Sequence, residues 1–188
     1  MKKDPKVKEI SVVHLRQVAL WYLERFGGTR LRVQAALKRR VVRAELAHGS
    51  KPEADTWIQE ILDELENLGY INDAAFAAAR VAKGLRQGKS PRLIAQDLAT
   101  VGLDPTLAQA ALADAGVKDR QTQLQAALTY ARKRGLGVYR VSRANLVPKK
   151  PDTTDLDTTD QDRRDLARMA RRGFTFDIAQ RALKGEQG

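Results

Sequence analysis

The sequence predicts an all-helical protein. Apolar residues recur every three or four positions along most of the chain, which is the spacing of an amphipathic helix. Glycine and proline fall mostly between these segments, and the valine or isoleucine runs that are typical of strands are missing. Eight or nine helices are therefore expected.

The expected helices follow one another with short turns between them. They cover about residues 15–26, 29–48, 53–68, 73–87, 91–101 and 121–134, with a short helix after Pro105 and two more after residue 160. Several begin at a side-chain oxygen that can accept from the free amides of the first turn. Ser50 with Glu53 has the spacing of a capping box, Asn72 or Asp73 can cap the fourth helix, and Ser90 can cap the fifth.

An internal repeat suggests that the chain is built from similar units. With a shift of 71 residues, Arg92–Leu112 aligns with Arg163–Leu183, Gly102 with Gly173, and seven of 21 positions are identical. Each unit of helix, glycine and short helix is too small to bury its own apolar face, so neighbouring units must pack side by side. We expect an elongated, curved molecule.

Composition indicates a polyanionic partner in a reducing compartment. The 188 residues contain 34 Lys and Arg against 23 Asp and Glu, a net charge of +11. Such an excess favours nucleic acid or something coated with it. Cysteine is absent, which excludes disulfides and thiolate sites. No stretch has the length and apolarity of a signal peptide or a membrane span, so we expect a cytoplasmic protein without a membrane partner.

The sequence offers little support for catalysis, and we predict no enzyme activity, cofactor or metal site. It has no phosphate-cradling glycine loop, and His14 and His48 are isolated. We expect both histidines to have surface or packing roles. The aspartates between Asp152 and Asp160 lack the glycine and closing glutamate of a calcium loop, so a solvated acidic insertion is expected there.

Two sets of arginines are the candidate binding residues. Each set has helical spacing that places its members on one side of a helix. The first comprises Arg32, Arg39 and Arg43, and the second Arg164, Arg168 and Arg171. The aromatic residues Trp21, Trp57, Tyr70, Phe76, Phe174 and Phe176 are expected mostly in the core, which argues against a base-stacking platform.

Three motifs together resemble the RecX family of regulatory proteins over about residues 15–184. They are Gly69-Tyr70-Ile71-Asn72-Asp73 with Phe76-Ala77, Gly88-Lys89-Ser90-Pro91-Arg92 with Gly102-Leu103, and Arg171-Arg172-Gly173-Phe174 with Ile178 and Leu183. The resemblance implies three tandem three-helix repeats, here 15–71, 72–116 and 120–184. A basic tail at 1–14 and an exposed acidic insertion at 137–160 depart from the family pattern.

The resemblance also implies a function without catalytic residues. A RecX-like protein binds RecA recombinase filaments on single-stranded DNA and modulates, mostly by inhibition, RecA ATPase, strand exchange and coprotease activities. We expect a monomer with weak, unspecific affinity for single-stranded DNA, which can extend to double-stranded DNA. The alternative is a direct DNA-binding protein or transcriptional regulator, which would show a large specificity ratio on duplex DNA.

Overall fold

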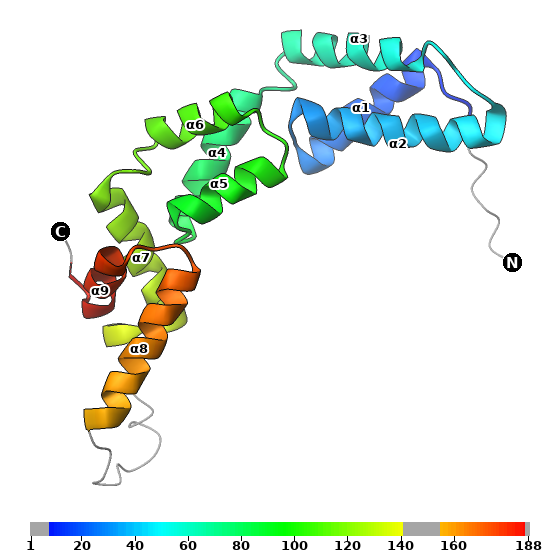
Figure 1. The fold of residues 1–188 in the computed structure, drawn as a ribbon. Helices are drawn as coiled ribbons and strands as arrows, with labels where there is room; N and C mark the ends of the chain where they lie inside the picture. The colour runs from blue at the N-terminus through cyan, green and yellow to red at the C-terminus, as the bar shows by residue number, and fades with distance from the viewer. Residues whose placement is uncertain (1–7, 141–154, 187–188) are drawn as a thin grey trace, which may run out of the picture. The chain divides into compact units, whose positions relative to one another are not determined.

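The computed structural model describes residues 8–140 and 155–186. Within these ranges the chain forms nine α-helices and one 3-10 helix and no strand, so the all-helical prediction is confirmed for the described residues (Figure 1). None of these helices is both long enough and apolar enough to cross a bilayer. The chain divides into two compact units, unit 1 (Met1–Phe76 with Thr100–Asp104) and unit 2 (Ala77–Ala99 with Pro105–Gly188).

Unit 1 is built around three helices that pack on one another. They are α1 (Val12–Phe26), α2 (Arg30–His48) and α3 (Ala54–Asn67). Leu15, Leu37, Ile58 and Leu62 are fully buried among them. Helix α1 begins earlier than the expected residue 15, because Ser11 Oγ accepts from His14 N and caps its first turn.

The expected capping box of α3 is wrong. Helix α3 begins after Glu53 without a side-chain hydrogen bond to its first turn. The segment before it is instead held to α2, since Lys51 N donates to Glu45 Oε1 at 3.1 Å. Asn72 caps α4 (Asp73–Arg86) by accepting from Ala75 N at 2.8 Å.

Unit 2 contains most of α4 and all the helices that follow Asp104, together with most of α5. These helices are α5 (Pro91–Thr100), α6 (Pro105–Asp114), α7 (Arg120–Arg134), α8 (Asp155–Arg171) and α9 (Phe176–Lys184), with the 3-10 helix η1 at Gly137–Tyr139. Helices α7, α8 and α9 share a core that includes Leu128, Met169 and Ile178. The segment expected as an insertion thus contains η1 and the start of α8, and its residues 141–154 lie outside the described ranges.

A buried hydroxyl in unit 1 links α2 to a residue far along the chain. The N-cap of α2 is Thr29, whose Oγ1 accepts from Arg32 N at 3.3 Å and donates to Val101 O at 2.9 Å. The next residue, Gly102, has φ +72° and lies so close to Leu31 that a Cβ there would overlap it. We call this contact the first junction.

The same arrangement recurs in unit 2. Ser90 is the N-terminal cap of α5, and its Oγ accepts from Leu93 N at 3.3 Å and donates to Arg172 O. Gly173 follows with φ +85°, and a Cβ there would lie 3.1 Å from Arg92 Cβ. We call this contact the second junction. Val101 and Arg172 are 71 residues apart, so the repeat detected in the sequence coincides with a repeated docking contact.

Replacing Ser90 with alanine is expected to destabilise unit 2 by about 2 kcal/mol, because the change removes a helix cap and leaves the carbonyl of Arg172 without its donor. Thr129→Ala is the control, since Thr129 Oγ1 donates within α7 to Gln125 O and lies nearer the surface. Thr129→Ala is expected to lower the stability of unit 2 by about 0.5 kcal/mol or less. Urea unfolding followed by circular dichroism measures both, and equal losses would contradict the role of the second junction.

Candidate functional site

The first set of arginines lies along one exposed side of α2. Arg32, Arg39 and Arg43 are all exposed and project from the side of the helix opposite the buried Leu37 and Val41. None of the three forms an ion pair with a carboxylate that the structure describes. The spacing therefore predicted their common face correctly, and that face carries uncompensated positive charge.

Other cations of unit 1 are neutralised by the acidic helix α3. The Arg30 guanidinium lies 2.6 Å from Asp63 and 2.7 Å from Glu66, and Arg16 pairs with Glu64. Burial alone would lower the pKa of Arg30, but hydrogen bonds and charges from Asp63 and Glu66 outweigh it and raise that pKa. The acidic face of α3 thus serves intramolecular pairing, which makes the unpaired arginines of α2 stand out.

The second set of arginines lies on α8 in unit 2. Arg164, Arg168 and Arg171 are exposed, roughly opposite the fully buried Met169. Arg168 lies 4.0 Å from Asp165, whereas the other two have no ion pair within the described part of the chain. Each set is therefore a separate basic surface on its own helix.

Asp165 fixes α8 to the segment after α7. Its carboxylate is almost buried and accepts from Gly137 N at 2.9 Å and from Arg140 Nε at 2.8 Å. Burial works to lower the pKa of Arg140, but the hydrogen bonds that it donates to Asp162 and Asp165, together with their charges, outweigh burial and raise that pKa. This ion-pair cluster sets the position of the helix that carries the second arginine set.

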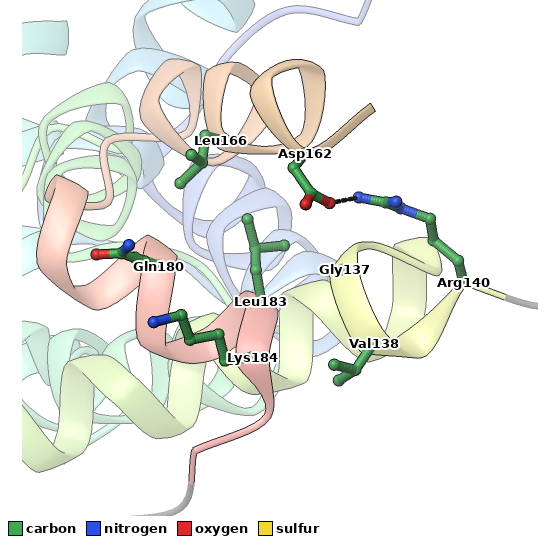
Figure 2. Close-up of a pocket in the computed structure, with 8 residues that line it drawn as sticks. All are labelled: Gly137, Val138, Arg140, Asp162, Leu166, Gln180, Leu183 and Lys184. Carbon is green, nitrogen blue, oxygen red and sulfur yellow. Dashed lines mark hydrogen bonds and ion pairs between the residues drawn. The ribbon is translucent and has the colours of Figure 1, made fainter. Parts of the chain in front are cut away.

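A cavity of about 410 Å³ lies beside this cluster. Figure 2 shows Leu166 and Leu183 on its walls, with the Arg140–Asp162 ion pair at one side. Of the two lining cations, Arg140 and Lys184, the first is paired with Asp162, and the lining side chains include no nucleophile next to a base. The cavity has therefore no grouping that could perform acid–base or nucleophilic catalysis.

Asp165→Asn is expected to lower the stability of unit 2 by about 2 kcal/mol, since it removes the charge that Arg140 and the Gly137 amide share. Asp160→Asn removes an equal charge from an exposed position that lies 4.0 Å from Arg163 and should change little. Thermal unfolding of both variants provides the comparison. A melting temperature of Asp165→Asn equal to that of the control would show that the cluster does not anchor α8.

Among the described residues, no side-chain cluster suits a metal ion, and His14 has a structural hydrogen-bond partner. No group of three or more His, Cys, Asp or Glu side chains there is arranged to hold a metal ion. His14 Nε2 accepts from Arg40 Nε at 3.3 Å, and burial, followed by the charges of Arg40 and Lys8, lowers its pKa. A neutral imidazole that accepts from arginine fits the packing role expected for His14.

The expected burial of the aromatic residues is only partly correct. Phe174 is buried, but Trp21, Tyr70 and Phe176 are 54%, 60% and 68% exposed. Trp21 packs edge-on against Phe26, with the Arg25 guanidinium within 6 Å of both ring centres. Trp21 lies two residues after the buried Ala19 and so on the opposite side of α1, and Tyr70 lies in the bend after α3. An exposed aromatic group next to arginine therefore exists after all.

Sequence reasoning also missed four basic side chains that line one cavity in unit 2. They are Lys89, Lys133, Arg134 and Arg172. They come from three separate segments, so helical spacing could not group them. The only available signal was that two of the four, Lys89 and Arg172, belong to the quoted family motifs, and those motifs meet at the second junction.

Comparisons with known proteins agree with the motifs. The family model described as "RecX, second three-helix domain" matches residues 72–112. A protein named "Regulatory protein RecX" from Myxococcus xanthus is 32% identical over 177 residues, which cover 94% of this chain and 87% of the relative. The chain therefore belongs to the RecX family.

Further relatives support the same family and fold. A "Regulatory protein RecX" from Bacillus licheniformis is 26% identical over 98% of this chain, which spans 63% of that relative. The crystal structure of RecX from Lactobacillus salivarius superposes with a TM-score of 0.60 at 20% identity, covering 93% of this chain and 96% of the other. The chain is thus a RecX-type regulator with the RecX fold, and these relatives are named regulatory proteins rather than enzymes.

Proposed function

We propose that this chain binds RecA filaments on single-stranded DNA and restrains their ATP hydrolysis and strand exchange. The proposal starts from the RecX family, whose known role the motifs imply. The structural observation that carries it is the pair of exposed arginine surfaces, on α2 and α8, in which five of the six side chains lack an ion pair among the described residues.

Exposed, uncompensated cations suit a partner coated with negative charge. Because no neighbouring carboxylate offsets their charge, such groups produce a positive electrostatic potential at the surface, which steers association with a polyanion. The six residues are Arg32, Arg39, Arg43, Arg164, Arg168 and Arg171. A regulator that works through such surfaces needs no catalytic pocket, because many moderate contacts along a filament can add up.

Reversing either arginine set to glutamate is expected to raise the protein concentration needed for half-inhibition of RecA ATPase by about tenfold, which corresponds to about 1.4 kcal/mol. The assay is single-strand-dependent ATP hydrolysis by RecA with substoichiometric amounts of this protein. The variants are R32E/R39E/R43E and R164E/R168E/R171E.

The charge-matched control is K83E/K118E/K184E, which reverses three exposed lysines outside both sets. It should inhibit nearly as well as the unaltered protein, and an unrelated basic protein should not inhibit. Unchanged inhibition by one arginine variant would remove that set from the interface. Absence of specific inhibition by the unaltered chain would refute the proposal and leave direct binding of duplex DNA as the alternative.

A further inference from the structure

A basic cavity of about 280 Å³ lies beside the second junction in unit 2. Four of its lining side chains are cationic, namely Lys89, Lys133, Arg134 and Arg172. Lys89 is paired with Asp97. The other three have no ion pair with any carboxylate in the ranges that the structure covers. Three basic residues without an ion pair in those ranges therefore line one concave site.

The cavity is also partly preorganised. Arg172 is held at both ends, because its carbonyl accepts from Ser90 Oγ and its Nε donates to Tyr130 Oη at 3.3 Å. Its guanidinium carbon lies 5.5 Å from the centre of the Tyr130 ring. Lys133 Nζ lies 3.4 Å from the carbonyl of Arg86. Fixing side chains before binding reduces the entropy that an incoming anion must offset.

A purely structural role is the main competing explanation, since cations are favourable near helix C-termini. The first junction tests this explanation within the same chain. When Thr29 is aligned with Ser90, Gly28 corresponds to Lys89, and Val101 corresponds to Arg172. The first junction makes the same hydroxyl-to-carbonyl contact with no cation at either position. The contact therefore does not require the charges of Lys89 and Arg172.

We propose that this cavity binds a backbone phosphate of single-stranded nucleic acid. Arginine and lysine donors converging on a small concavity match the oxygens of a phosphodiester. Unit 2 supplies 21 Lys and Arg against 11 Asp and Glu, whereas unit 1 supplies 13 against 12, so ten of the eleven net positive charges belong to the unit with the cavity. A flexible single strand can bend a phosphate into a concave site, which a stiff duplex does less readily.

This proposal assigns a site to the weak affinity for single-stranded DNA that the RecX resemblance implies, and binding at this cavity needs no RecA. The test measures the affinity of a fluorescent oligo(dT) by anisotropy at several salt concentrations, with this protein alone. The variant R172V/K133Q places at the second junction the valine that the first junction carries. K83Q/K118Q removes two exposed lysines of unit 2 outside the cavity and is the matched control.

The cavity variant is expected to bind about tenfold more weakly, and the slope of log K against log salt should fall by about 0.7, the value for one phosphate contact of a single strand. The control should change the affinity less than about twofold. A second variant, K133Q/R134Q, leaves Arg172 and the second junction intact and should show the same loss, which separates binding from folding.

Two probes identify the bound group. An oligonucleotide with uncharged methylphosphonate linkages should bind the cavity variant and the unaltered protein equally, because it offers no charged phosphate. Polyglutamate should not show the tenfold dependence on the cavity. Equal oligo(dT) binding by variant and control, or an equal dependence with polyglutamate, would overturn the proposal. Because RecA is absent, either result leaves the ATPase test of the proposed function unaffected.

Discussion

The hydroxyl-to-carbonyl contact at the two junctions is the interaction on which the rest of the fold depends. Thr29 and Ser90 each cap a helix and, with the same oxygen, donate to a backbone carbonyl 72 and 82 residues away. Both hydroxyls are fully buried, so each must keep its partners or pay a desolvation penalty. Glycine follows each of these carbonyls, as Gly102 and Gly173, and its lack of a side chain lets the two segments approach closely. Small helical units that cannot bury their own faces thereby acquire a fixed register.

Charge is distributed unevenly over this framework. In unit 1 the acidic helix α3 neutralises cations of α1 and α2, as the pairs Arg16–Glu64 and Lys38–Asp55 show. The arginine set on α2 has no such carboxylate partner among the described residues. In unit 2 the aspartates of α8 share their helix with four arginines, and the unit carries nearly all of the net charge. The positive electrostatic potential of the chain therefore originates mainly in unit 2, whereas unit 1 offers the local basic surface of α2.

Local features were predictable from the sequence, and contacts between distant residues were not. The caps at Asn72 and Ser90 and the common face of each arginine set follow from spacing within one helix. The expected cap at Ser50 failed, because packing of the preceding segment against α2 and Glu9 fixed the entry of α3 instead. The exposure of Trp21, by contrast, follows from spacing, since Trp21 lies two residues after the buried Ala19 and therefore on the opposite side of α1.

Two copies of one junction in a single chain help to separate packing from function. Where the copies agree, in the capping hydroxyl and in Gly102 and Gly173, the agreement follows from the geometry of the contact. Where they differ, the hydroxyl-to-carbonyl hydrogen bond does not require a particular side chain. Gly28, Leu31 and Val101 at the first junction correspond to Lys89, Arg92 and Arg172 at the second, whereas Arg30 and Arg32 correspond to Pro91 and Leu93. Cations therefore accompany both junctions at different positions, and the residue that offers its carbonyl is uncharged in unit 1 and cationic in unit 2.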